Sequence, residues 1–216
     1  MSKKILIFGI GPLSKIVVSL CKDIETIDVV GFIVDDEFYK FDNFIDLPVF
    51  KYSTVSPFDF EIISCVGYKS MRKRKDIYNR LNNDGFKFTN IIHQSVTICD
   101  GFVLGENNII FPNVCIEPNV ELGNNNVIWS QTLLGHDCKI GNHNYIAANV
   151  LVGGNVFLKD NSFLGNSTSM INDIVIEEET YLVAGSFLYN STEKFNKYFG
   201  MPARKVSSHI ENGIEI

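Results

Sequence analysis

LGNNNVIWSQTLLGHDCKIG (residues 122–141) carries an aliphatic side chain at every sixth position, at Leu122, Ile128, Leu134 and Ile140. The same spacing continues without interruption from Ile92 to Leu188. A period of six fits neither an α-helix, which repeats near 3.6 residues, nor a single strand, which repeats at two. It is typical of short parallel strands stacked into a solenoid, and it predicts a parallel β-helix.

The phase of this repeat predicts which side chains point inward. With Leu134 as position zero, positions zero and four of each hexad should fill the core. Three hexads complete one triangular coil, so a residue should lie directly beside the one three hexads further on. Ala148, Asn166 and Ala184 then share one corner. Either these small residues leave backbone N–H groups open to a long ligand, or a tight corner simply favours them.

His136 and Asp137 occupy positions two and three, which should lie outside the core near a corner. An exposed imidazole beside a carboxylate can act as a general base with its orienting acid. Gly154, three hexads later, should lie beside His136 and offer a backbone N–H to a developing oxyanion. His143 should lie on the surface or in an interface. Cys138 falls at inward position four, so we expect it in the core and not as a nucleophile.

The chain before the repeats has an α/β pattern. Residues 3–9 (KKILIFG) form an apolar run closed by glycine, followed by a helical pattern. Strand, glycine and helix in this order are typical of nucleotide-binding units, because glycine lets backbone amides and the helix start approach a phosphate. A second strand over 28–36 ends in Asp35-Asp36, which either hold a ribose or sugar hydroxyl or face solvent.

The rest of this part is predicted as follows. Residues 38–57 look irregular, 60–67 form a third strand, 70–85 a helix, and FKFTNII (86–92) one last strand. The basic cluster at 72–75 is either a solvated helix face or the neighbour of an anionic ligand. We therefore predict an α/β plus β fold, with a small Rossmann-like domain over 1–90 and a β-helix with a C-terminal cap over 91–216. The first domain is too short for a complete dinucleotide site.

The amino-acid composition argues against several classes of binding partner. A formal net charge of −6 argues against nucleic acid and anionic membranes, which call for a basic surface. No apolar run is long enough to span a bilayer, and the MSKKILIFGIGP start is typical of a first strand and not of a secretion signal. The five cysteines form no CxxC pair and indicate reduced thiols in a cytoplasmic protein, with no metal site.

The hexads, GHDCKIG (135–141) and FGMPARKV (199–206) resemble the hexapeptide-repeat acyltransferases. KKILIFGIGP (3–12), FIVDD (32–36) and SCVGYKSMR (64–72) are similar to the branch of sialic acid O-acetyltransferases and bacillosamine-pathway sugar N-acetyltransferases. The resemblance implies a left-handed β-helix, acetyl-CoA as cosubstrate without a metal, and a homotrimer with active sites between subunits.

The resemblance also implies residue roles. His136 corresponds to the catalytic base and Asp137 to the acid that raises its basicity. Acetyl-CoA contacts fall on Tyr145, Asn166 and Ala184, with Tyr145 standing where the family has a histidine. Nucleotide-sugar contacts fall on Gly11, Pro12, Leu13, Asp35, Asp36, Glu37, Gly67 and Tyr68, the first three departing from a Ser-Gly-His type of loop.

The expected reaction is transfer of an acetyl group from acetyl-CoA to the amino group of a UDP- or dTDP-linked amino-deoxy sugar, a 4-amino sugar being favoured, in surface glycan (lipopolysaccharide O-antigen) biosynthesis. The alternative is O-acetylation of sialic acid or another sugar hydroxyl. A metal-dependent β-helix enzyme would need three histidines between subunits, and apart from His93 at the domain junction the repeats hold only His136 and His143. A β-helix used for assembly alone would not need the His-Asp pair.

Overall fold

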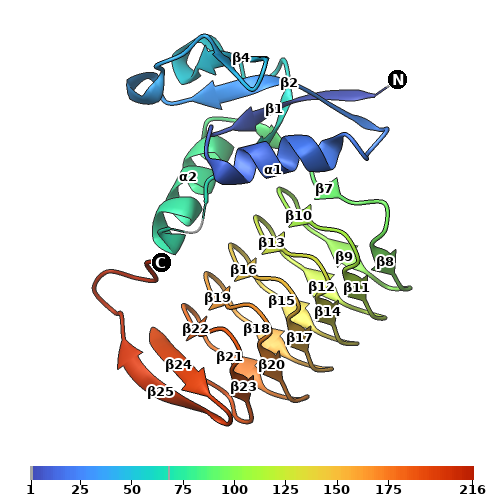
Figure 1. Ribbon diagram of the computed structural model, residues 1–216, viewed down its shortest axis with the longest axis vertical. Coiled ribbons are helices and arrows are strands. Elements are labelled where there is room, and N and C mark those ends of the chain that lie inside the picture. Colours follow the sequence, from blue (N-terminus) through green and yellow to red (C-terminus); the bar gives the residue numbers. More distant parts are fainter. Residues whose placement is uncertain (1, 68) are drawn as a thin grey trace.

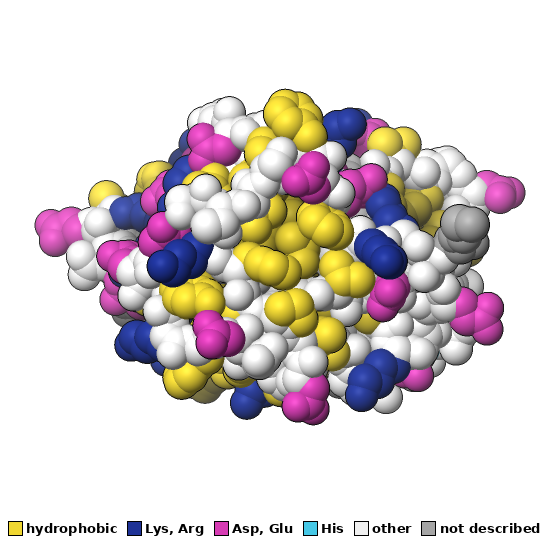
Figure 2. All heavy atoms as spheres, turned by 90° about the horizontal axis from the view of Figure 1, so that it is seen from above, with side chains coloured by type: hydrophobic (Ala, Val, Ile, Leu, Met, Phe, Trp, Pro, Cys, Tyr) yellow, Lys and Arg dark blue, Asp and Glu magenta, His cyan; other side chains and the backbone are white. Residues whose placement is uncertain are grey.

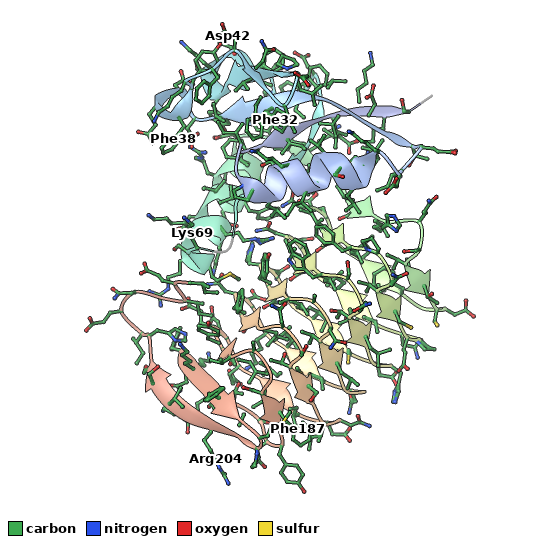
Figure 3. All side chains as sticks on the ribbon, in the orientation of Figure 1. Phe32, Phe38, Asp42, Lys69, Phe187 and Arg204 are labelled. Atoms are coloured by element: carbon green, nitrogen blue, oxygen red, sulfur yellow. The ribbon has the colours of Figure 1, made fainter. Side chains whose placement is uncertain are left out.

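The computed structural model describes residues 2–67 and 69–216. An α/β unit with a six-stranded sheet lies above a long triangular coil of short strands (Figure 1). The segment that follows the second strand lies farthest from the coil's end: Phe38 and Asp42 are at the opposite end of the molecule from Phe187 and Arg204 (Figure 3). No helix among these residues is long and apolar enough to cross a membrane.

The sheet of the α/β unit has the order β3-β4-β2-β1-β5-β6. Its strands are β1 (Lys3–Phe8), β2 (Ile27–Val34), β3 (Asn43–Phe44), β4 (Leu47–Lys51), β5 (Glu61–Ser64) and β6 (Lys87–Phe88). All neighbours are parallel except β3 and β4. Alternate side chains of β1 face opposite sides, so Ile5 and Ile7 pack with α1 (Pro12–Cys21), whereas Leu6 and Phe8 pack with α2 (Met71–Asn83).

Two sequence expectations for this unit were wrong. Residues 38–57 are not irregular: they hold β3, β4 and parts of two 3₁₀ turns, η1 (Asp36–Phe38) and η2 (Tyr52–Thr54). The Asp36 carboxylate ties these turns together by accepting hydrogen bonds from Ser53. FKFTNII is not one strand either, because the chain leaves the sheet after β6 and enters the coil at β7. Asn90, between the two, already donates to Gly105 of the coil.

The face that the α/β unit turns away from the coil shows hydrophobic side chains gathered at its centre (Figure 2). Several apolar residues of segment 36–58 are exposed, among them Phe38, Phe41 and Phe58. The coil lies on the other side of this unit (Figure 1).

The coil consists of three parallel sheets, one on each side of the triangle. The first sheet holds β7 (Ile91–Ile92), β10 (Ile109–Ile110), β13 (Val127–Ile128), β16 (Tyr145–Ile146), β19 (Phe163–Leu164) and β22 (Tyr181–Leu182). The second holds β8 (Thr97–Ile98), β11 (Cys115–Ile116), β14 (Leu133–Leu134), β17 (Leu151–Val152), β20 (Ser169–Met170) and β23 (Phe187–Leu188). The third holds β9 (Val103–Leu104), β12 (Glu121–Leu122), β15 (Lys139–Ile140), β18 (Phe157–Leu158) and β21 (Val175–Ile176).

The pairing register confirms the predicted stacking of every third hexad. Ile116 pairs with Leu134, and Leu134 with Val152. Leu134 and Cys138 are both fully buried, so positions zero and four point inward as expected. The chain turns at position three of each hexad, where every sixth residue from Asn107 to Glu179 has a positive φ between 53° and 64°. Asparagine and aspartate tolerate this left-handed conformation best, and they dominate that position.

One corner of the coil holds the α/β unit through buried polar contacts. Asn107 Nδ2 donates to Asn125 Oδ1 (2.7 Å), and the Asn125 amide contacts His143 Nδ1 at 2.9 Å. From α2, Arg74 Nη2 donates to the Asn125 carbonyl oxygen (2.6 Å), while the ring of Tyr78 packs edge-on against His143. His143 is thus buried in the interface between the α/β unit and the coil, and burial lowers its pKa to about 4.

The basic cluster at 72–75 is, as a whole, neither a solvated helix face nor the neighbour of an anionic ligand. Arg72 binds the buried Glu179 carboxylate through Nε (2.8 and 3.1 Å), and Arg74 is 1% exposed, so both hold the coil. Only Lys73 of the four is fully exposed.

The C-terminal segment closes the coil and returns to the α/β unit. β24 (Asn196–Gly200) and β25 (Ala203–Ser208) form an antiparallel hairpin whose turn lies at Met201-Pro202. β24 continues the first sheet beside β22. Beyond the hairpin, Ile214 is buried in the core of the α/β unit, and its carbonyl oxygen accepts from the N–H of Met71. The capping segment therefore also ties the two parts together (Figure 1).

Candidate active site

His136 and Asp137 lie at the corner between β14 and β15. His136 Nδ1 is 2.8 Å from Asp137 Oδ2, and the side chains are 53% and 51% exposed. Because a carboxylate only accepts, the neutral ring carries its proton on Nδ1 and presents the Nε2 lone pair. This hydrogen bond is the main cause that raises the pKa of His136, and Glu117 and Asp173 add to it by their charge. The same bond, with a second from Asn119, lowers the pKa of Asp137.

Gly154 lies against the imidazole, as the stacking predicted. A Cβ at this position would be 2.5 Å from His136 Nε2 and 2.7 Å from Cε1, so only glycine leaves room for the ring. Its N–H group is not open, however: it donates to Asn172 Oδ1 at 3.0 Å. A role for this N–H in holding an oxyanion would require the exposed Asn172 side chain to swing away.

The same correction applies at the neighbouring corner, where the N–H of Ala148 donates to Asn166 Oδ1 at 3.1 Å. The N–H of Gly154 is therefore not open as expected, and at Ala148 the structure does not show the open donor that was one of the two alternatives. The cause is the stacking itself, which brings an asparagine of the next coil within hydrogen-bond distance of the amide.

A cavity of about 490 Å³ lies between the start of α1 and the corner after the first sheet. It joins two sets of residues that the sequence had separated, Pro12 and Leu13 of the proposed nucleotide-sugar loop and Tyr145, Asn166 and Ala184 of the proposed acetyl-CoA contacts. Trp129, Phe163 and Tyr181, which sequence analysis missed, line it as well. Among the described residues that line the cavity, none has a charged side chain, so it suits an apolar or aromatic group.

Within one chain, this cavity and His136 are apart. Ala148, Asn166 and Ala184 follow strands of the first sheet, whereas His136, Gly154 and Asn172 follow strands of the second, so the width of the second sheet separates the two corners. The outward side chains of the second sheet include Cys115, Leu133, Leu151 and Phe187, and Leu151 is 46% exposed. The structure thus brings together the proposed acetyl-CoA contacts, but not those contacts and the proposed base.

The remaining predicted residues belong to the α/β unit. Gly11 follows β1 and Gly67 follows β5, at the carboxyl ends of neighbouring strands between which the chain order reverses. Such a switch point is where open α/β sheets bind ligands. Asp35 already pairs with Arg80 (2.7 Å) and Asp36 with Ser53, while Glu37 is exposed. Tyr68 lies outside the described residues.

Sequence analysis also missed Glu117 and Asn119. The Glu117 Oε2 accepts from the His136 N–H (2.8 Å), and Asn119 Nδ2 donates to Asp137 Oδ1 (3.0 Å). The three-hexad spacing from Asn119 to Asp137 was available as a signal. Among the described residues, no group of three or more His, Cys, Asp or Glu side chains is arranged to hold a metal ion.

The model of the "Bacterial transferase hexapeptide (six repeats)" family matches residues 101–136 and 119–154, the part of the coil that holds His136. No curated protein matches the chain.

Solved structures match nearly the whole chain. The acetyltransferase domain of PglB from Neisseria gonorrhoeae FA1090 is 18% identical, with a TM-score of 0.84 over 95% of this chain and 100% of that one, and it has also been solved with acetyl coenzyme A. PerB from Caulobacter crescentus, in complex with CoA and GDP-perosamine, is 20% identical, with a TM-score of 0.66 over 94% and 97%. WeeI from Acinetobacter baumannii AYE is 15% identical, with a TM-score of 0.63 over 95% and 100%. The predicted fold, a small α/β unit followed by a left-handed β-helix, is confirmed.

Proposed function

We propose that this chain transfers an acetyl group from acetyl-CoA to the amino group of a nucleotide-linked amino-deoxy sugar. The observation that carries the proposal is the His136-Asp137 pair, hydrogen-bonded at 2.8 Å with Nε2 directed away from the carboxylate, on an outer corner of a hexapeptide coil. Structural neighbours that share the fold were solved with acetyl coenzyme A or with CoA and GDP-perosamine, which supports the same pair of substrates here.

The proposed reaction is a direct attack. The sugar nitrogen adds to the thioester carbonyl and forms the C–N bond, while His136 Nε2 takes the proton that the nitrogen loses. The carbonyl then re-forms as the C–S bond breaks, and the CoA thiolate leaves with the proton held by His136. Asp137 holds the tautomer and stabilises the imidazolium. General-base help of this kind contributes roughly 10²–10⁴-fold. Cys138 offers no acyl-enzyme route, because it is fully buried and burial raises its pKa to about 11.

A homotrimer completes the proposed site. The cavity at the corner after the first sheet and His136 at the corner after the second are parts of one site only if the second sheet of one copy faces a neighbouring copy. Its exposed Leu151 and the half-buried Leu133 and Phe187 support such a contact. In this arrangement acetyl-CoA lies between subunits, with Tyr145, Asn166 and Ala184 of one chain near His136 of the next.

The proposed acceptor binds at the switch point of the α/β sheet, near Gly11, Pro12, Leu13, Gly67 and Tyr68. UDP- and dTDP-linked 4-amino sugars are the proposed class, made in the cytoplasm for surface glycans. Asp35 and Asp36 have protein partners, so of the three acids Glu37 is the better placed to contact a sugar hydroxyl.

The test is a free-thiol assay with acetyl-CoA and UDP-, dTDP- and GDP-linked 3- and 4-amino sugars, with sialic acid as the hydroxyl acceptor. We expect turnover with an amino sugar and a loss of at least a hundredfold in His136→Ala at neutral pH. A milder loss at high pH would mark an amine acceptor, because an amine that is already neutral needs less help from a base. Turnover with sialic acid alone, or no turnover and no CoA binding in calorimetry, would overturn the proposal.

A further inference from the structure

The turn Glu117-Pro118-Asn119 lies directly beneath His136 and Asp137 and makes three hydrogen bonds to them. Glu117 Oε2 accepts from the His136 N–H (2.8 Å), the Pro118 carbonyl oxygen from the Asp137 N–H (3.0 Å), and Asn119 Nδ2 donates to Asp137 Oδ1 (3.0 Å). Two of these bonds recur along the coil: the N–H of Asn149 donates to the Ser130 carbonyl oxygen as that of Asp137 does to Pro118, and Asn155 Nδ2 donates to Asp173 Oδ1 as Asn119 does to Asp137.

The Glu117 bond departs from the pattern of the coil. At several other corners the N–H at position two donates to an asparagine of the next coil, as Ala148 does to Asn166 and Gly154 to Asn172. Above His136 that place is taken by Gly154, whose missing side chain makes room for the imidazole. The N–H of His136 therefore lacks the usual acceptor, and the Glu117 carboxylate from the coil below takes its place.

The Asn119 bond orients the carboxylate. A Cβ on Gly101 would be 2.4 Å from Asn119 Oδ1, so the amide oxygen packs against a glycine while its nitrogen points at Asp137. With Oδ1 engaged by Asn119, Oδ2 is held for His136 Nδ1. The side chain of Asp137 is half exposed, and without this bond its χ angles would be free to turn the carboxylate from the ring.

We propose that Glu117 and Asn119 are positioning residues for the catalytic pair: Asn119 orients the Asp137 carboxylate, and Glu117 holds the His136 backbone and places a negative charge beside the imidazole. The inference rests on the proposed function, in which His136 is the base. The carboxylates that act on His136 are Asp137, Glu117 from the coil below and Asp173 from two coils above. Each favours the imidazolium that forms when the sugar amine gives up its proton.

The two contributions of Glu117 are separable. Glu117→Gln keeps a carbonyl oxygen that accepts from the His136 N–H but removes the charge, whereas Glu117→Ala removes both. We expect the pKa of His136 to fall in both variants. The kcat should stay within about threefold in Glu117→Gln and fall about tenfold in Glu117→Ala, because small misplacement of a catalytic group is costly.

Asn119 has a φ of 60°, so Asn119→Gly removes the amide without straining the backbone. We expect kcat to fall about tenfold with KM unchanged, since the loss is one of orientation and not of binding. Asn113→Gly is the matched control: Asn113 is also exposed, has a φ of 59°, and lies one hexad earlier at another corner. Its kcat should equal that of the wild type.

A titration by ¹⁵N NMR tests the proposal without any substrate. The chain has four histidines, and the His136 signals are assigned by comparison with His136→Gln. We expect the neutral ring to carry its proton on Nδ1 in the wild type and to shift toward the Nε2 tautomer in Asn119→Gly, while Glu117→Gln lowers the pKa. Unchanged tautomer and kcat in Asn119→Gly, or an unchanged pKa in Glu117→Gln, would overturn the assigned role. If the wild type turns over no acceptor, the proposed function fails, and the NMR result still decides the positioning.

Discussion

Gly154→Ala is expected to disable the site while leaving the fold intact. The added Cβ would be 2.5 Å from His136 Nε2, 2.7 Å from Cε1 and 3.0 Å from Cδ2. Ordinary carbon contacts begin near 3.5 Å, so the ring must move by about 1 Å. A misplacement of that size at a reacting centre costs on the order of 10²-fold in rate.

Gly154→Ala should leave the stability of the fold almost unchanged. The His136 side chain is 53% exposed, so the ring can turn into solvent, and Gly154 does not have the positive φ that would penalise alanine. We expect the free energy of unfolding, from urea titration, to change by no more than about 0.5 kcal/mol.

The assay is kcat/KM for CoA release from acetyl-CoA with the accepted amino sugar, in a double-mutant cycle with His136→Ala. Because Gly154 acts through the imidazole, Gly154→Ala should cost about a hundredfold in the wild type and almost nothing once His136 is alanine. A variant with full kcat/KM would refute the reasoning. So would a hundredfold loss that persists without the imidazole, because it would assign Gly154 a separate role.

His143 has a pKa near 4 in the folded chain and about 6.5 in the unfolded chain, so the unfolded state binds more protons between these pH values. The free energy of unfolding should therefore fall by up to about 3 kcal/mol as the pH drops from about 6.5 to about 4. His143→Asn continues the asparagines of this corner and should remove that slope in urea titrations; an unchanged slope would contradict the assignment. Leu151→Arg puts a charge on the second sheet and should convert the proposed trimer to monomers in analytical ultracentrifugation, with at least a hundredfold loss of activity. An active monomer would rule out a shared site. Ala184→Trp fills the cavity and should weaken CoA binding at least tenfold in calorimetry. An unchanged affinity would show that CoA does not bind in this cavity.

In the α/β unit, the sequence predicted the main strands and helices but not the short strands or the partners of the basic residues. Its glycine-closed strands and two helices follow from local patterns, and they lie where expected. Segment 38–57 was missed because its strands are short and depend on contacts distant in sequence, such as Asp36 with Ser53. Arg72 and Arg74 were taken as one basic cluster, although each is held by a different residue of the coil.

The sequence by itself determined the coil and the place of His136 on it. Each strand of the coil pairs with the strand three hexads further on, so the sequence spacing alone tells which residues are neighbours in space. Leu134 and Cys138 therefore had to point inward, and Gly154 had to lie beside His136. Tertiary structure alone decided which hydrogen bonds the side chains make in that geometry: Asn172 accepts from the N–H of Gly154, Glu117 accepts from the N–H of His136, and Asn119 donates to Asp137. It also decided that a cavity forms between the start of α1 and the corner that holds Asn166 and Ala184. The physical reason is that the repeat sets backbone positions, whereas hydrogen-bond partners depend on rotamers and on packing between parts that share no period.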